Sequence, residues 1–192
     1  MRCGYACILG SLKLLRMVRK DYADPIGLQI ELSHSPEVWD TLTFRTTEGP
    51  HRELSDIWVR YNALENFDGD MQRFNAEHVP SWYPVVEKIP SARYLSEKIA
   101  YDFDADLGGV LITKIPPHKQ CYPHVDKGWH AGYYEKFAFQ VKGNKSQSFH
   151  VEDEILVTVD GDLFYFDNSH THWVLNESDE DRITMIVCLR RH

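Results

Sequence analysis

The stretch "YPHVDKGWH", residues 122–130, places His124 and Asp126 two positions apart. Alternate residues of an extended strand point to the same side, so this imidazole and this carboxylate would lie side by side and could hold a divalent metal ion. A structural histidine beside a solvated aspartate would give the same letters. Because His-x-acid triplets also begin at His51 and His150, the spacing alone does not distinguish the two interpretations.

Residues further along the chain favour the metal site. His172 opens another alternating, apolar segment, and Arg182 opens the next one. Two imidazoles and one carboxylate that leave coordination positions free form the arrangement used by non-heme Fe(II) in O2 chemistry. Arg182 and Thr184 would share one face of a strand, where a guanidinium beside a hydroxyl makes a good receptor for a carboxylate.

The segment 108–190 resembles the catalytic core of the aspartyl/asparaginyl β-hydroxylase family, within the Fe(II)/2-oxoglutarate-dependent dioxygenases. The matching pieces are "LITKIPPHKQCYPHVD" and "GDLFYFDNSHTHWVLNESDEDRITMIV". The family pattern FDxSxxHxVxN reads "FDNSHTHWVLN" here, which makes His172, rather than His170, the counterpart of the distal iron ligand. Residues 1–107 carry much less of the resemblance.

The resemblance implies a metal centre and a cosubstrate pocket. The implied Fe(II) ligands are His124, Asp126 and His172. The contacts expected for 2-oxoglutarate are Arg182, Thr113, Thr184 and Lys136. The reaction would use O2, convert 2-oxoglutarate to succinate and CO2, and hydroxylate an amino-acid side chain in a protein or peptide or as a free amino acid.

Two departures from the family pattern affect these assignments. Some members have glycine in place of the carboxylate ligand, whereas this chain has Asp126. An Arg-x-His pattern on the strand after the His-x-Asp loop becomes Lys136-Phe137-Ala138 here, and the loop before it is longer. The way in which both carboxylates of 2-oxoglutarate would be held therefore stays partly open.

Other interpretations compete at individual residues. Arg182 could instead pair with the acidic turn at 179–181, although exposed ion pairs contribute only about 0–1 kcal/mol. Possible substrate contacts are Arg60, His130 and His170, with a surface position as the alternative for both histidines. Trp58 and Trp82 could line a substrate pocket or pack in the core.

Three other functions fit parts of the pattern. The same scaffold could hydroxylate an unrelated small metabolite, because one fold supports many functions. A cupin-like metal-binding protein or isomerase would use no 2-oxoglutarate, but it would have no need of Arg182. A non-catalytic interaction module would have no need of a complete set of metal ligands.

The elements that must position these residues are mostly strands. Strands are predicted at 56–64, 108–115, 136–143, 154–159, 162–167, 172–177 and 182–190, with turn residues between the later ones. Helices are predicted at 8–20 and 90–101, the latter with Ser91 as N-cap. We expect a mainly β fold, a double-stranded β-helix (jelly-roll, cupin-like) with N-terminal helices packed outside, and the His-x-Asp triplet just after the first strand of the jelly roll.

Composition limits the remaining possibilities. At 192 residues the chain is expected to form one domain, 1–192. The net charge of −8 argues against broad nucleic-acid binding, which requires a basic face. No apolar run is long enough for a membrane span, and four scattered cysteines are typical of a cytoplasmic protein without a disulfide framework. The oligomeric state is not indicated.

Overall fold

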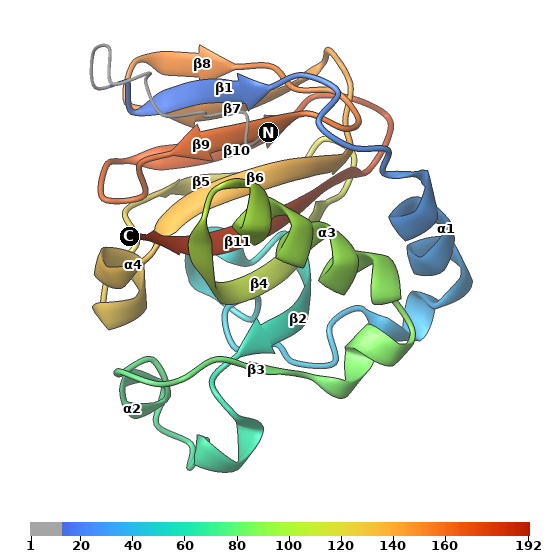
Figure 1. Ribbon diagram of the computed structural model, residues 1–192. Helices are drawn as coiled ribbons and strands as arrows, with labels where there is room; N and C mark the ends of the chain where they lie inside the picture. Colours follow the sequence, from blue (N-terminus) through green and yellow to red (C-terminus); the bar gives the residue numbers. More distant parts are fainter. Residues whose placement is uncertain (1–12) are drawn as a thin grey trace.

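Two antiparallel β-sheets face each other in the computed structural model, which describes residues 13–192 (Figure 1). The larger sheet has seven strands in the order β1-β9-β6-β11-β4-β2-β3, and the smaller sheet has four in the order β5-β10-β7-β8. From β4 to β11 the chain alternates between the two sheets, except that β7 and β8 are neighbours in the small sheet. The predicted fold class is therefore confirmed.

The strands are short except for β4 and β11, which cross the middle of the large sheet. Their bounds are β1 (Leu15–Arg19), β2 (Ser55–Tyr61), β3 (Ser81–Trp82), β4 (Ala105–Ile115), β5 (Gln120–His124), β6 (Glu135–Lys142), β7 (Gln147–Val151), β8 (Glu154–Leu156), β9 (Leu163–Phe166), β10 (His172–Asn176) and β11 (Arg182–Arg191). The α-helices are α1 (Ile26–His34), α2 (Met71–Phe74), α3 (Pro90–Asp102) and α4 (Trp129–Tyr133), and four 3-10 turns are η1 (Pro36–Val38), η2 (Gly49–His51), η3 (Leu64–Asn66) and η4 (Pro84–Glu87).

The large sheet is buried on both faces, which explains the continuous apolar runs in β6 and β11. In β6, Phe137 and Phe139 belong to one hydrophobic cluster and Ala138 belongs to another. Successive side chains of a strand point to opposite faces, so one cluster lies under the helices and the other lies between the sheets. In β11, Met185 belongs to the cluster under the helices, while Thr184 points to the space between the sheets.

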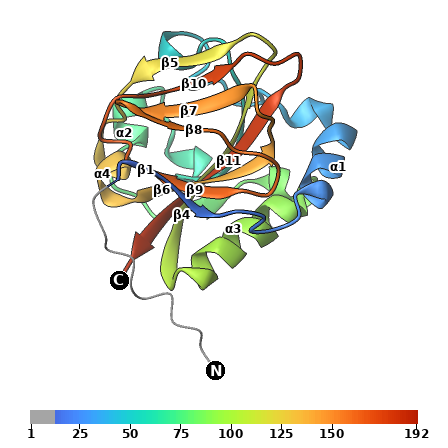
Figure 2. The ribbon, with the colours of Figure 1, turned by 90° about the horizontal axis from the view of Figure 1, so that it is seen from above.

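Helices α1 and α3 cover the outer face of the large sheet, on the side away from the small sheet (Figure 2). Leu28 and Leu32 of α1 join Ile99 of α3 in the cluster that contains Phe137 and Met185. These side chains are almost fully buried. The expectation of helices packed outside a jelly roll is confirmed.

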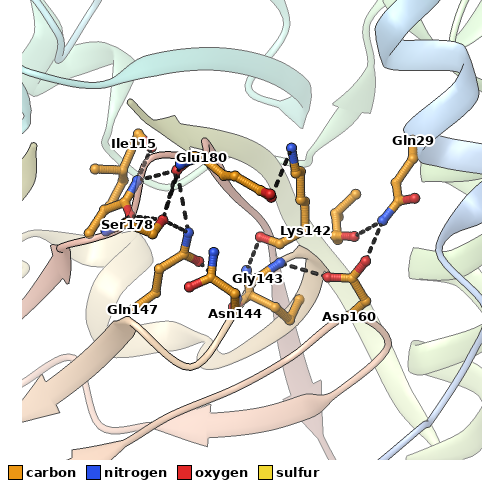
Figure 3. A network of polar contacts seen from close by, with 12 residues as sticks. Gln29, Ile115, Lys142, Gly143, Asn144, Gln147, Asp160, Ser178 and Glu180 are labelled. Carbon is orange, nitrogen blue, oxygen red and sulfur yellow. Dashed lines mark hydrogen bonds and ion pairs between the residues drawn. The ribbon is translucent and has the colours of Figure 1, made fainter. Parts of the chain in front are cut away.

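A network of polar contacts fixes the turn that leads into β11 (Figure 3). The Asn176 side chain donates to the Ile115 carbonyl at 2.9 Å and to the Glu180 carbonyl at 2.8 Å. Gln147 donates to the Ser178 hydroxyl at 2.9 Å, and that hydroxyl donates to Asn176 at 2.7 Å. The turn at 177–181 is thereby tied to the end of β4, so the chain enters β11 in a fixed register at Arg182.

The predicted helix at 8–20 is wrong for residues 13–20, the part of it that the structure describes. Leu15–Arg19 form β1, and Leu15 pairs with Phe166 on β9. Leucine, lysine and arginine favour helices intrinsically, but pairing with the open edge of β9 outweighs that preference. The part of this prediction at 8–12 lies outside the described residues.

Other boundaries also differ from expectation. Helix α3 starts at Pro90, so Ser91 lies inside its first turn and its hydroxyl donates to Glu31 at 2.7 Å instead of capping the helix. The strand expected at 154–159 ends at Leu156. The triplet begins at His124, the last residue of the unpredicted β5, and so lies at the end of the second strand of the jelly roll rather than just after the first. That strand contains Pro123 and lies at a sheet edge, where proline is tolerated.

Among the described residues, no helix is long and apolar enough to cross a bilayer.

Candidate metal centre

The two predicted histidine ligands lie on neighbouring strands. His124 ends β5, His172 begins β10, and the two residues are directly paired across the antiparallel ladder. Their ring centroids are 4.3 Å apart. Asp126 follows on the loop after β5, with Oδ1 3.5 Å from Nε2 of His124 and 3.9 Å from Nε2 of His172. One donor atom from each side chain lies within 4.8 Å of the other two.

Backbone carbonyls fix the orientation of both imidazoles. Nδ1 of His124 donates to the Tyr122 carbonyl at 2.7 Å, and Nδ1 of His172 donates to the His170 carbonyl at 3.0 Å. Since a carbonyl can only accept, the proton of each neutral ring is on Nδ1 and the lone pair is on Nε2. Metal-binding histidines are typically held in this way. The donor set fits a divalent metal ion.

The Asp126 carboxylate is also held in place. Its Oδ2 accepts from the Asn168 side chain at 3.2 Å, and its backbone N–H donates to the Asn168 carbonyl at 3.1 Å. This leaves Oδ1 toward the histidines. Asn168 is a site residue that was not predicted, although it lies in the "FDNSHTH" motif.

The protonation of the centre follows from its burial and charges. Burial opposes the charged form of Asp126, but the hydrogen bond from His124 and the positive charge of Lys136 hold its pKa well below the usual range. Burial likewise lowers the pKa of His124, but Asp126 outweighs this effect and raises that pKa to about 10. A metal ion would therefore replace a proton shared by this pair.

His124 also belongs to a second group of possible ligands. Its donor atoms and those of His51 and Cys121 lie within 4.8 Å of one another. The Cys121 sulfur is 3.9 Å from Nδ1 of His124, the nitrogen that already donates to a carbonyl. Because both groups need His124, they cannot be filled independently.

The side chains of His124, Asp126 and His172 line a cavity of about 380 Å³ between the sheets. Arg182, Thr184 and Thr113 line the same cavity. Arg182 is only 2% exposed, and one of its guanidinium nitrogens donates to the Thr184 hydroxyl. Thr184 pairs with Thr113 across β11 and β4. The strand pattern predicted that Arg182 and Thr184 share a face, and the resemblance implied Thr113; all three side chains line the same cavity.

The receptor formed by Arg182 and Thr113 has unused hydrogen-bonding capacity. Nη2 of Arg182 and Oγ1 of Thr113 are buried without a partner among the described residues. Burial lowers the pKa of Arg182 to about 9. A buried cation without a carboxylate partner is costly, so this pocket fits a ligand that supplies one, and the distal carboxylate of 2-oxoglutarate has the required chemistry.

The acidic turn before β11 does not neutralise Arg182. Glu180 pairs with Lys142 at 3.4 Å, and Asp179 pairs with His118 at 2.9 Å. Among the described residues, no carboxylate lies within ion-pair distance of Arg182. The alternative interpretation of this arginine is therefore wrong.

Lys136 is a second buried cation in the cavity. Its ammonium nitrogen is 3.1 Å from the Cys188 sulfur and 3.4 Å from Nδ1 of His130. The structure brings it to the same cavity as Asp126, as the resemblance implied.

The three possible substrate contacts separate into two groups. Arg60 and His130 line the cavity. His170 is outside the cavity lining; its side chain is 43% exposed and lies 3.4 Å from Asp167.

Arg45 is a further cavity residue that was not predicted. It makes a two-point ion pair with the fully buried Asp56, at 2.6 and 3.1 Å. Burial lowers the pKa of Arg45, but the ion pair outweighs this and raises it. No sequence pattern predicts the ion pair between Arg45 and Asp56, because it depends on where β2 lies in the fold.

Comparison with known proteins gives the same family as the sequence. A family model described as aspartyl/asparaginyl beta-hydroxylase matches residues 28–192. No curated protein matches the chain.

Solved structures share the fold at low identity. The viral collagen prolyl hydroxylase of Paramecium Bursaria Chlorella virus-1, in its 2-oxoglutarate complex, is 11% identical with a TM-score of 0.52, over 94% of this chain and 98% of that one. A Pseudomonas putida prolyl-4-hydroxylase is 12% identical with a TM-score of 0.50, over 94% of each chain. A 2OG-Fe(II) oxygenase family oxidoreductase from Burkholderia pseudomallei is 13% identical with a TM-score of 0.50, over 72% and 68%.

Proposed function

Because this chain belongs to the aspartyl/asparaginyl β-hydroxylase family, whose enzymes use Fe(II) and 2-oxoglutarate, we propose that it hydroxylates an amino-acid side chain. His124, Asp126 and His172 hold the Fe(II). Arg182, with Thr113 and Thr184, binds the distal carboxylate of 2-oxoglutarate. Residues 1–192 act as one catalytic domain.

The observation that carries the proposal is the position of Arg182. A buried guanidinium without a carboxylate partner lies in the same cavity as two imidazoles and a carboxylate with metal-ligand spacing. In a metal-binding protein that does not use 2-oxoglutarate, the buried charge of Arg182 would destabilise the fold, and no ligand carboxylate would offset it. A cosubstrate with a free carboxylate accounts for both features.

Bound Fe(II) supplies the activation of O2, which couples loss of CO2 from 2-oxoglutarate to insertion of one oxygen atom into a C–H bond. The chain's own residues determine where this takes place. The Tyr122 and His170 carbonyls keep the Nε2 lone pairs of His124 and His172 toward the metal. Asn168 keeps Oδ1 of Asp126 toward it.

The apolar walls keep water from the cosubstrate. Four apolar side chains line the cavity around the metal centre and belong to the hydrophobic cluster between the sheets: Phe149, Phe166, Val174 and Ile115. Low polarity around Arg182 strengthens its attraction for a carboxylate. Three protein ligands leave coordination positions free for cosubstrate and O2.

The test is formation of succinate from 2-oxoglutarate by Fe(II)-loaded protein with ascorbate, first with amino acids and then with peptides. We expect wild-type protein and His170→Ala to form succinate and His172→Ala to form none. His170 is the matched control, because it is two positions away and lies outside the cavity lining. Succinate formation in His172→Ala together with its loss in His170→Ala would contradict the assignment.

A further inference from the structure

Two cysteines in the described part of the chain, Cys121 and Cys188, are free and buried. Both line the cavity that contains the candidate metal centre, so a small oxidant that enters the cavity can reach either sulfur. Sγ of Cys121 is 3.9 Å from Nδ1 of His124 and 4.0 Å from the Tyr122 carbonyl. Sγ of Cys188 instead accepts from the ammonium of Lys136 at 3.1 Å. Of the two cysteines, only Cys188 is in contact with a primary amine.

The register of the large sheet holds Cys188 and Lys136 together. Cys188 on β11 is directly opposite Lys136 on β6 in the antiparallel ladder, and both strands are interior to the sheet. Side chains that are opposite each other in such a ladder point to the same face, with Cβ atoms about 4.5–5.5 Å apart. Backbone pairing therefore sets the contact between sulfur and nitrogen, which does not depend on a loop.

A second contact keeps the Lys136 nitrogen in place beside the sulfur. The ammonium is 3.4 Å from Nδ1 of His130. Burial lowers the pKa of His130 to about 2, so the ring is neutral and Nδ1 can accept from the ammonium. Gly109 leaves room for this ring, because a Cβ there would be 3.0 Å from Nε2 of His130. Among the described residues, no carboxylate is within ion-pair distance to draw the ammonium away.

This pair has a defined reaction with a peroxide. Cysteine sulfur is oxidised to a sulfenic acid, which condenses with a nucleophile that lies close to it. In the first step the Cys188 thiol takes one oxygen atom from hydrogen peroxide, and water leaves. In the second step the Lys136 ammonium releases a proton, its nitrogen attacks the sulfur, the S–O bond breaks, and a second water leaves. One thiol, one ammonium and one peroxide thus give a sulfenamide, two waters and one proton.

We propose that Cys188 and Lys136 form a site of reversible oxidative modification, at which hydrogen peroxide joins Sγ to Nζ by a covalent S–N bond. The bond links β11 to β6 on the cavity face and removes the ammonium charge of Lys136 from the cavity. A thiol reductant restores both side chains, because attack of its thiolate on the sulfur releases the amine. The reaction takes place without metal or 2-oxoglutarate and so does not rest on the proposed function.

Peptide mapping of the full-length protein, without added metal, tests for this bond. The protein is treated with hydrogen peroxide, its remaining thiols are alkylated, and it is digested with trypsin. Trypsin requires a free lysine side chain, so the bond blocks cleavage after Lys136. We expect residues 128–142 to stay linked to residues 183–190, with a mass two hydrogen atoms below the sum of the two peptides. Dithiothreitol before alkylation should separate the peptides and restore cleavage after Lys136.

Lys136→Arg should lose the linked peptide completely, because it keeps a cation beside the sulfur but has no primary amine. Lys142→Arg is the matched control. Lys142 lies on the same strand but pairs with Glu180 at 3.4 Å, so this variant should form the bond as wild type does. Cys121 is the internal control and should gain oxygen without a link to any lysine. If Lys136→Arg fails to fold, the comparison of Cys188 with Cys121 in wild-type protein still decides.

Three results would overturn the inference. One is oxidation of Cys188 to a sulfinic acid with normal cleavage after Lys136. Another is a linked peptide that retains an oxygen atom between nitrogen and sulfur, and the third is a Cys188 thiol that does not react with peroxide. Failure of the proposed function is measured separately, as the absence of succinate, and leaves the result of the peptide map unchanged.

Discussion

His172 lies directly opposite His124 across the ladder between β10 and β5. The backbone pairing of two strands thus fixes the separation of the two imidazoles, and Asp126 needs to be placed only by the loop that follows. A slip of one residue in this register would turn one histidine to the opposite face of the sheet. The metal site therefore depends on strand pairing as much as on ligand type.

Asn168→Ala should weaken metal binding by about 10–100-fold, since groups that orient metal ligands typically contribute that much. The Asn168 side chain donates to Asp126 and holds its carboxylate toward the histidines. Co(II) titration followed by absorption spectroscopy measures the change. Ser169→Ala is the control, because Ser169 is exposed and its hydroxyl donates to Asp167 instead. Unchanged Co(II) affinity in Asn168→Ala would show that the carboxylate needs no such support.

Arg182→Ala should weaken 2-oxoglutarate binding by a few hundred-fold or more, because a buried carboxylate without its partner costs roughly 3–5 kcal/mol. Arg182→Lys should retain part of the affinity, since it keeps the charge but loses the two-point geometry. Arg190→Ala, at the exposed end of the same strand, should change nothing. Calorimetric titration of metal-loaded protein checks all three, and near-normal affinity in Arg182→Ala would favour a metal protein that uses no 2-oxoglutarate.

Asp126→Gly should keep some activity at high Fe(II), whereas His124→Ala should not. Some members of the family have glycine at this position, and water can replace a carboxylate oxygen more readily than an imidazole nitrogen. Decarboxylation of 2-oxoglutarate as a function of Fe(II) concentration separates the two variants. Equal loss of decarboxylation in both variants, with no recovery at high Fe(II), would mean that the carboxylate is as necessary as the imidazole.

Asp102→Asn should destabilise the protein near neutral pH but not in acid. Burial opposes the ionised form of Asp102, but hydrogen bonds from Lys98 and Tyr22 outweigh this effect and lower its pKa. A lowered pKa stabilises the fold above the unfolded-state value of about 3.9, and this contribution is lost as pH falls below it. The carboxylate is partly exposed, so we expect about 1 kcal/mol.

Urea unfolding of wild-type protein and Asp102→Asn at pH 7 and at low pH measures this difference. Glu97→Gln, which removes an exposed pair on the same helix, is the control. A difference between wild type and Asp102→Asn that stays constant with pH would rule out a charge effect.

The sequence was sufficient to predict β4, β10 and β11, which carry Thr113, His172 and Arg182, because alternation and turn residues mark them clearly. It did not predict β5, which carries His124 and contains Pro123. It predicted His172 over His170 through a motif, and the structure brings His172, rather than His170, beside His124 and Asp126. It did not predict β1, since the local helix preference of Leu15–Arg19 is overridden by pairing with β9. Such pairing between distant segments leaves no local pattern.

Residues contributed by irregular segments were also not predictable. Arg45 precedes β2 without regular structure and reaches Asp56 only after the strand is in place. Asn168 lies in a motif, but its contact with Asp126 depends on the loops after β5 and β9 meeting in space.

The most direct test of the central claim, that one cavity binds both Fe(II) and 2-oxoglutarate, is the visible charge-transfer absorption of their complex without O2. Adding 2-oxoglutarate to Fe(II)-loaded wild-type protein should produce this absorption, and succinate should not. His172→Ala should show none, and Arg182→Ala should need a few hundred-fold or more 2-oxoglutarate. Protein that binds Fe(II) but develops no such absorption at any 2-oxoglutarate concentration would contradict the account.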